Sequence, residues 1–375
     1  MPSLELSTGP LRQFGAPGES LTLITADAPG PRGTWPDPIA PDLAPDLAEL
    51  GAGYRGVQHL TLPQDASLGA LLAAETAPDA HVLAVCPGRF LDSPTPEQLG
   101  ARKLAVLPAG STPVTADQVR YLIDCARRTD VDVQEELAAQ FFDRVEQSAR
   151  LLLVDDANGT EAEFDHTAGD VVWNLQAGRM EPGDQQILPA GKISATAAEI
   201  TDFDPDARLR GLTGALTLHG WPIVHRHADP ADAADQRRLF EDLSALVSHP
   251  VTLRLDGGVI QDVAAADRAA GRAADTLTRL LADDPRYRVV WELGFGINTA
   301  MDVIPANCGP NEVYGASAGA VNLGIGTTPD TRFALAFLCP RSSLLEQDGT
   351  ALLGARKAAR RGRLRRTTAA SCGCH

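Results

Sequence analysis

Glu292 has the clearest chemical context of any residue in this chain. It follows an apolar run, Val289–Trp291, that predicts a buried strand, and it precedes a glycine-rich turn. In α/β proteins an acidic side chain at the end of a strand commonly lies where ligands bind or chemistry occurs. Glu292 is therefore a candidate metal ligand or general base.

The glycines after Glu292 match only part of the glycine motif of a nucleotide-binding loop. Gly294 and Gly296 match half of the dinucleotide fingerprint, but its third glycine would fall on Thr299, and no helical pattern follows. We therefore exclude a nucleotide-binding loop.

Three histidines form a second candidate metal site. His225 and His227 lie two residues apart in a predicted strand, so both side chains should point to one face, and His219 is close in sequence. Polar residues on a strand surface explain the same pattern.

The chain end, with Cys372, Cys374 and His375, offers only three soft ligands, too few to close a zinc site.

Three segments resemble motifs of the thermophilic metallo-aminopeptidase family. They are LPAGKISAT at Leu188–Thr196, ELGFGIN beginning at Glu292, and GAVNLGIG at Gly319–Gly326. The family motifs run approximately LPxGEVxxxP, AELGIGxNP and GTVHIAxG, followed by HxDxIL, which corresponds to FALAFL here. The resemblance covers about residues 150 to 349 and implies an aminopeptidase-like C-terminal domain.

The resemblance also implies where metal ligands would lie. In the family two Glu, two His and one Asp of these motifs hold two divalent metal ions. The matching positions here are Lys192, Glu292, Asn322, Phe333 and Leu335, so only Glu292 keeps a ligand type. Two metal ions need several anionic or imidazole ligands, and an ammonium among them repels metal. We expect a cleft that holds no metal and needs no cofactor, with Lys192 paired to Glu292.

The loop after the Glu292 strand supplies further expected neighbours of this cleft, namely Asn298, Cys308 and Glu312. Cys308 would need an activating histidine to act as a nucleophile, and the sequence assigns it none.

The loss of ligands implies a non-catalytic peptide-binding protein. The chain is similar in this respect to the metal-less, aminopeptidase-derived proteins of crocagin-type biosynthesis, which bind the precursor of a ribosomally made, modified peptide. Expected partners are thus a precursor or leader peptide, the biosynthetic enzymes that act on it, and further copies of this chain or another. The alternative is an enzyme, either a metal-dependent aminopeptidase or an iron-dependent ring-cleaving dioxygenase that uses displaced histidines.

Composition limits the other classes. The formal charge of −16 argues against general nucleic-acid binding, although seven basic residues cluster at 356–366. The start lacks a signal peptide and no apolar run is long enough to span a membrane, so we expect a cytoplasmic bacterial protein.

The pattern of elements predicts an α/β (α+β) chain. Residues 1–149 should form a small N-terminal α/β domain, 150–350 a β-rich C-terminal domain, and 351–375 a flexible basic tail. The entry up to about residue 50 is rich in Pro, Gly and Asp, and we expect it to hold at most two short strands and to wrap around the core without joining it.

Overall fold

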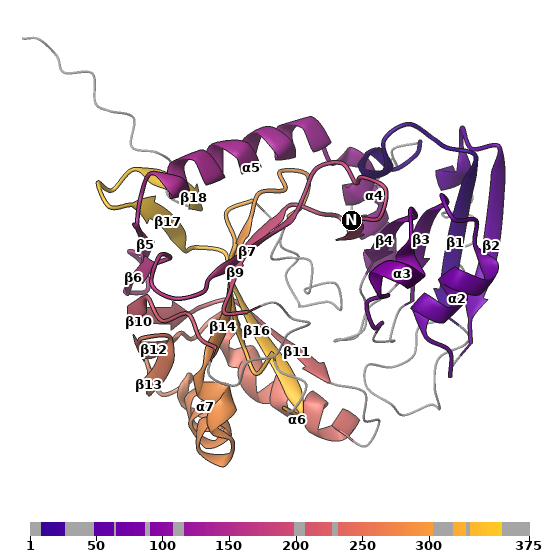
Figure 1. The fold of residues 1–375 in the computed structure, drawn as a ribbon. Helices are drawn as coiled ribbons and strands as arrows, with labels where there is room; N and C mark the ends of the chain where they lie inside the picture. Colours follow the sequence, from indigo (N-terminus) through magenta and orange to yellow (C-terminus); the bar gives the residue numbers. More distant parts are fainter. Residues whose placement is uncertain are drawn as a thin grey trace, which may run out of the picture.

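The chain forms three β-sheets with helices packed around them (Figure 1). The computed structural model describes residues 9–26, 49–63, 65–86, 91–107, 116–198, 207–226, 232–302, 318–327 and 331–354. Helices and strands are mixed as the sequence predicts, so the expected α/β (α+β) fold class is confirmed. No helix in the described ranges is long and apolar enough to cross a membrane.

The N-terminal sheet is parallel, with its strands in the order β2-β1-β3-β4-β8. Three helices lie between its strands in the sequence, namely α2 (Leu68–Glu75), α3 (Pro96–Leu99) and α4 (Ala116–Arg128). The strands are β1 (Ser20–Ala26), β2 (Gly56–Leu62), β3 (His81–Val85), β4 (Lys103–Leu107) and β8 (Gln185–Ile187).

One expectation about the entry segment is wrong. β1 lies between β2 and β3, inside the sheet, and Leu21, Leu23 and Ile24 on it are buried. The Pro- and Gly-rich composition of the entry obscures this short run of β-branched and apolar residues, which favours a strand.

The remaining strands form two antiparallel sheets. The first has the order β13-β12-β10-β6-β5-β17-β18 and the second the order β11-β16-β15-β14-β9-β7. The first sheet contains β5 (Arg150–Asp155), β6 (Thr160–Asp165), β10 (Leu212–Leu218), β12 (Val251–Asp256), β13 (Val259–Ala265), β17 (Ser343–Glu346) and β18 (Ala351–Gly354). The second contains β7 (Val172–Gln176), β9 (Lys192–Thr196), β11 (Trp221–Arg226), β14 (Val290–Gly296), β15 (Val321–Ile325) and β16 (Phe333–Cys339).

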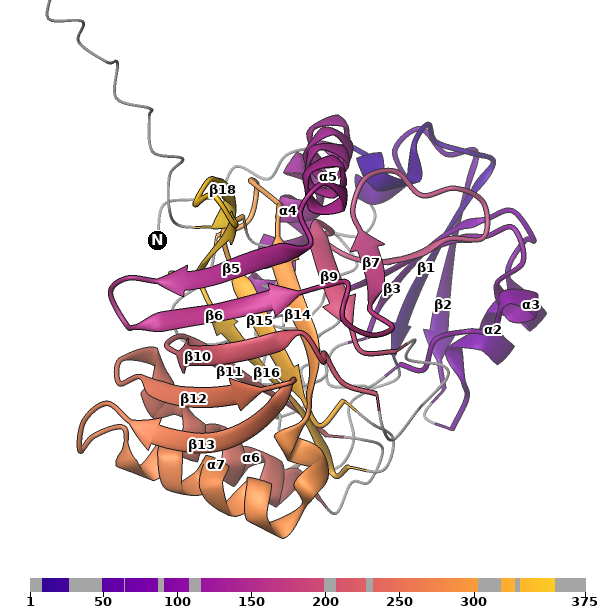
Figure 2. The same cartoon turned by 60° about the vertical axis from the view of Figure 1, so that its left-hand side comes forward.

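The two antiparallel sheets bury one shared hydrophobic core. Alternate residues of each strand face it, because successive side chains of a strand point to opposite faces. Phe164 from the first sheet and Phe295 from the second belong to this core. Helices α5 (Val131–Glu146), α6 (Ala233–Leu243) and α7 (Gly271–Asp283) add side chains to it. Figure 2 shows α6 and α7 together below the sheets and α5 above them.

The predicted boundary between residues 149 and 150 falls between α5 and β5 and stays a prediction. β8 lies well beyond it in sequence, yet it pairs with β4 in the N-terminal sheet.

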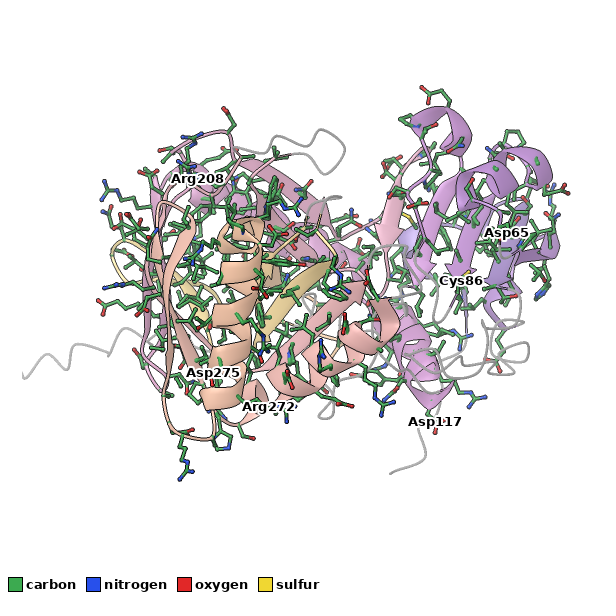
Figure 3. The ribbon with its side chains drawn as sticks, turned by 90° about the horizontal axis from the view of Figure 1, so that it is seen from below. Asp65, Cys86, Asp117, Arg208, Arg272 and Asp275 are labelled. Atoms are coloured by element: carbon green, nitrogen blue, oxygen red, sulfur yellow. The ribbon has the colours of Figure 1, made fainter. Side chains whose placement is uncertain are left out.

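Figure 3 shows the two ends of the molecule, with Asp65 and Cys86 at one and Arg272 and Asp275 of α7 at the other. Residues 351–354, which the sequence places in the tail, form strand β18, and 355–375 lie outside the described residues.

Candidate functional site

Glu292 lies inside strand β14, whereas the sequence predicts it at a strand end before a glycine turn. The two glycines after it continue the strand, because β9 and β15 pair with it on both sides. The candidate site is therefore one face of a sheet, and its side chains follow the twofold alternation of the strands.

The strand register places Lys192, Glu292 and Asn322 on the same face. Glu292 pairs with Thr196 of β9 and with Gly324 of β15, while Gly294 pairs with Asn322. Residues that are paired in antiparallel strands, and those two positions further along, point to one side of a sheet. The intervening residues, such as Leu293 and Leu323, point the other way into the shared core.

Two glycines give the charged side chains room on this face. A Cβ added at Gly294 would lie 2.7 Å from Cε of Lys192, closer than real carbon atoms approach. A Cβ at Gly324 would lie 3.0 Å from Cβ of Glu292. The glycine-rich character of β14 and β15 thus permits the Lys192 chain to lie across the sheet and reach Glu292.

The expected ion pair is present. Nζ of Lys192 lies 2.6 Å from Oε1 of Glu292, and the two side chains are 22% and 19% exposed. Asn322 is buried, and its Nδ2 donates a long hydrogen bond of 3.4 Å to Oε2 of Glu292. The Glu292 carboxylate is therefore neutralised by an ammonium and further contacted by an amide.

The structure does not bring Phe333 and Leu335 to this face, which corrects their assignment to the cleft. Both side chains are buried in the core shared by the two antiparallel sheets. Ala336 pairs with Gly324, so Ala334 and Ala336 occupy the face that carries Glu292. The motif comparison puts the ligand positions on Phe333 and Leu335, each one residue away from an alanine on the Glu292 face. A shift of one residue along a strand turns each side chain to the opposite face.

Asn298 is buried below the sheet surface, where it holds a turn together. Its Nδ2 donates to the carbonyls of Ala190 at 2.6 Å and Pro189 at 3.1 Å, and to Oγ1 of Thr129 at 3.0 Å. These contacts give it a structural role beside the cleft strands. Cys308 and Glu312 lie outside the described residues.

The structure separates the histidines of the second candidate metal site. His219 lies in the turn before β11, with its Nδ1 buried and lacking a hydrogen-bond partner among the described residues. Burial, together with the charge of Arg341, lowers the pKa of His219. His225 lies near the far end of β11, about 13 Å along the strand from its first residue, Trp221, at a rise of roughly 3.3 Å per residue. His227 falls outside the described residues.

The donor set does not fit the metal centre that the resemblance implies. Within the described ranges no three His, Cys, Asp or Glu side chains lie together as metal ligands would. The Lys192 ammonium and the Asn322 amide contact the Glu292 carboxylate, and the β16 residues on the same face include Ala334 and Ala336. Neither a two-metal hydrolytic centre nor a histidine–carboxylate iron site can be assembled from these residues.

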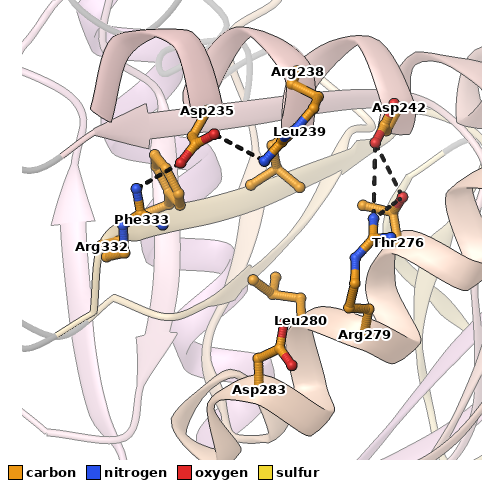
Figure 4. A pocket seen from close by; sticks show the side chains of 10 residues that line it. All are labelled: Asp235, Arg238, Leu239, Asp242, Thr276, Arg279, Leu280, Asp283, Arg332 and Phe333. Carbon is orange, nitrogen blue, oxygen red and sulfur yellow. Dashed lines mark hydrogen bonds and ion pairs between the residues drawn. The ribbon is translucent and has the colours of Figure 1, made fainter. Parts of the chain in front are cut away.

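A charged cavity of about 140 Å³ lies elsewhere, between α6, α7 and the start of β16 (Figure 4). Arg332 binds Asp235 at 2.8 Å and also contacts Asp232. On the other side of the cavity Thr276 donates to Asp242 at 3.3 Å. The Thr276–Asp242 contact connects the two helices, and the Arg332 contacts connect α6 to the start of β16, so we assign the cavity a structural role.

Sequence reasoning missed the small residues of β16 that shape the site, Ala334 and Ala336. The available signal was the alternation of large and small residues along β16, where Phe333, Leu335 and Phe337 alternate with alanines. That alternation shows which face of the strand is buried.

No family model and no curated protein match this sequence. Among solved structures, the chain is similar to 2,5-dihydroxypyridine dioxygenase from Pseudomonas putida KT2440, with 15% identity, 91% of this chain and 92% of that chain covered, and a TM-score of 0.56. It also matches AmpT from Thermus thermophilus at 14% identity, over 91% of this chain and 93% of that one, with a TM-score of 0.45. At such identity the likeness to the dioxygenase shows a shared fold and leaves the chemistry to the residues described above.

Proposed function

We propose that this protein binds a peptide without cleaving it, on a scaffold whose metal-binding positions have been converted to an ion pair. The observation that carries the proposal is the 2.6 Å contact between Lys192 Nζ and Glu292 Oε1. An ammonium at this distance competes with any cation for the carboxylate.

The same contact argues against hydrolysis at this face. Metal-assisted hydrolysis needs a bound water made acidic by one or two dications, which several anionic or imidazole ligands must hold. Glu292 alone could act as a general base, but its Oε1 already faces the Lys192 ammonium and is not free to take a proton from a water.

Small residues favour a peptide as the ligand. Ala334 and Ala336 are partly exposed, and with Gly324 they keep the surface beside Glu292 close to the level of the backbone. An extended chain can approach such a surface closely. The resemblance to aminopeptidase motifs points to the same class of ligand.

The proposal extends to the biological setting. A precursor peptide of a ribosomally made, modified product is the expected ligand, and the enzymes that modify it are the expected partners, in the bacterial cytoplasm. The role would be to hold the precursor while these enzymes act.

Calorimetry with synthetic peptides from the short reading frames that neighbour its gene tests the proposal. We expect saturable binding and no cleavage of the peptide after incubation with added zinc, manganese or cobalt. Metal-dependent peptide hydrolysis that is lost in Glu292→Ala would establish an aminopeptidase. Iron-dependent ring cleavage of a dihydroxypyridine would establish a dioxygenase. Absence of binding by every neighbouring peptide would reject the proposed function.

A further inference from the structure

We infer that two copies of this protein associate through strand β2, whose outer edges pair in antiparallel register about His59 and join the two N-terminal sheets into one. The inference goes beyond the proposed function and is independent of it. It rests on the free backbone groups of an exposed sheet edge, on the sequence of that strand and on the helix that lies beside it.

β2 is the outermost strand of the N-terminal parallel sheet, and Figures 1 and 2 both show it on the outside of the molecule. Residues 56–59 are all exposed, with Val57 at 42%. Exposed sheet edges are normally protected by charged side chains, by proline or by a covering segment, because they pair readily with other chains. Between Arg55 and Asp65 the sequence contains no Asp, Glu, Lys or Arg, and its proline, Pro63, follows the strand.

The outward backbone groups of β2 belong to Val57, His59 and Thr61. The N–H of Gly56 donates to the carbonyl of Glu19 at 2.9 Å, so the backbone groups of Gly56 point toward β1. Successive residues of an edge strand direct these groups to opposite sides. In the described part of the chain nothing bonds to the outward N–H and C=O groups of the three residues. The edge is therefore open to another strand.

A second copy of β2 can use all of these groups at once. In an antiparallel pair centred on His59, this residue lies opposite His59 of the second copy, and Val57 lies opposite Thr61. Residues opposite each other at such positions exchange both of their N–H···O=C bonds, so every outward group finds a partner. A pair moved by two residues puts Val57 opposite Pro63, which has no N–H, or Thr61 opposite Arg55, before the strand begins. The strand is thus complementary to itself in one register.

The side chains of β2 suit this register. Val57 and Thr61 are β-branched, and cross-strand contacts between such residues stabilise a sheet. The nearest formal charges in the sequence, Arg55 and Asp65, have opposite signs and flank opposite ends of the strand; Arg55 also binds Glu19 at 2.7 Å. Antiparallel pairing puts the Arg55 end of each copy beside the Asp65 end of the other, and a twofold axis repeats this arrangement. Parallel pairing would put like charges together.

Helix α2 supports the same interface. It lies on one face of β2, where Nε2 of Gln58 donates to the carbonyl of Glu75 at 3.1 Å. A helix on a protein surface normally exposes polar side chains, but residues 68–74 of α2 contain none. The exposed positions among them are Ala70, Ala73 and Ala74. Because a joined sheet keeps its faces, α2 of both copies lies on one face, on either side of the twofold axis. This composition suits a helix that a second copy partly covers.

Sedimentation equilibrium of the full-length protein tests the dimer. We expect the wild type to form dimers reversibly. His59→Lys and His59→Glu each put two like charges directly opposite, so each should raise the dissociation constant roughly tenfold or more. An equimolar mixture of the two variants puts an ammonium opposite a carboxylate and should restore a mixed dimer. Gln261→Lys, at an exposed position of edge strand β13 in another sheet, should leave the equilibrium unchanged.

Hydrogen–deuterium exchange at single residues tests the register. The N–H groups of Val57, His59 and Thr61 should exchange more slowly as the protein concentration rises, whereas those of Gln58 and Leu60, which point toward β1, should not respond. Thr61→Pro removes one outward N–H and leaves the bonds to β1 in place, since an edge strand tolerates proline on its outer side. The variant should keep the circular dichroism of the wild type and lose the dependence on concentration.

Each alternative outcome overturns the inference. A wild-type protein that stays monomeric at every concentration rejects the dimer, and a dimer that persists in both charge variants lies on another surface. A mixture of the variants that stays monomeric contradicts the register. Slow exchange at β2 that does not depend on concentration would show that a segment of the same chain covers the edge. None of these results bears on peptide binding beside Lys192 and Glu292, so the proposed function is tested separately.

Discussion

Nζ of Lys192 lies 2.6 Å from Oε1 of Glu292, across two neighbouring strands of one sheet. Both side chains are about four-fifths buried, so neither charge would be fully hydrated without the other. Breaking a fully buried pair by removing one partner costs roughly 3–5 kcal/mol, and exposed pairs contribute less than about 1 kcal/mol. This pair lies between those limits.

Lys192→Met should therefore lower the free energy of unfolding by about 1–3 kcal/mol, because Glu292 keeps its charge and loses its partner. Glu292→Gln should cost a similar amount for the opposite reason. The double variant should be clearly more stable than the sum of the single effects predicts. Urea unfolding of the four proteins measures the coupling, and strict additivity would show that the two charges do not interact.

Gly294→Ala should destabilise the protein by about 1–3 kcal/mol, because the added methyl overlaps Cε of Lys192 and presses on Asn322. In a Lys192→Ala background that carbon is gone, so the same glycine substitution should cost less. Gly271→Ala on α7 serves as the matched control, because a Cβ there meets no atom within 4 Å. An equal cost of Gly294→Ala in both backgrounds would contradict the packing argument.

Much of the fold could be predicted from periodicity. The strands of the middle section and helices α4 and α5 follow patterns that are read locally. The central place of β1 in its sheet escapes such a prediction because Pro- and Gly-rich sequence surrounds it. The pairing of β8 with β4 could not be predicted, because it depends on contacts between residues about eighty positions apart.

The candidate site could be predicted in part. Lys192, Glu292 and Asn322 lie together as the motif comparison implies. The assignments of Phe333 and Leu335 are wrong because matching a motif by position ignores which face of the strand each residue occupies. Successive side chains of a strand point to opposite faces. The buried anchoring role of Asn298 depends on tertiary contacts to Thr129 and Ala190, which no local pattern predicts.

The stability of the protein should fall as the pH drops through about 6.5, the ordinary pKa of histidine, and below it. Burial, and then the charge of Lys103, lower the pKa of His81 below its ordinary value of 6.5, while Oη of Tyr54 lies 2.7 Å from its Nδ1. As the pH falls, His81 therefore takes up a proton in the unfolded chain before it does so in the folded protein. The contribution of neutral His81 to folding stability is complete above the pKa of the unfolded state. It is lost as the pH falls from that pKa to the lower pKa of the folded state. His219, whose pKa is also lowered, contributes with the same sign.

Urea unfolding of wild type and His81→Phe at several pH values measures the share of His81. The phenyl ring can keep the stacking against Phe14, whose ring centroid lies 4.8 Å away, but it cannot titrate. The variant should show a shallower slope, with the remainder due to His219. An unchanged slope would mean that His81 does not titrate differently in the folded and unfolded states.

Elemental analysis should find no stoichiometric divalent metal bound at Glu292 after incubation with zinc, manganese or cobalt and removal of excess ions. The Lys192 ammonium competes for the carboxylate, and the Asn322 amide that contacts it supplies no anionic ligand. Glu292→Ala should then leave the metal content unchanged. A stoichiometric ion that this substitution removes would restore the enzyme interpretation.

Asn298 should be among the most sensitive positions for stability, although it carries no chemistry. Its amide donates to two carbonyls and a hydroxyl, its Oδ1 accepts from the Ala300 amide at 2.9 Å, and a Cβ at Gly191 would lie 2.6 Å from its own Cβ. This packing holds the turn that leads into Lys192 at the start of β9. We therefore expect substitution of Asn298 to disturb the Lys192–Glu292 pair as well.

Asn298→Asp tests this role most sharply, because it keeps the shape and replaces the donor by an oxygen that faces the carbonyls of Pro189 and Ala190. We expect a loss of about 2–4 kcal/mol, since buried carbonyls lose their donor and a charge is buried beside them. Asn298→Ala should cost less than the aspartate, and Thr129→Val, which removes one of the three acceptors, less again. Faster amide exchange at Lys192 and Ile193 in Asn298→Asp would tie the turn to the site, whereas an aspartate variant as stable as wild type would refute the anchoring role.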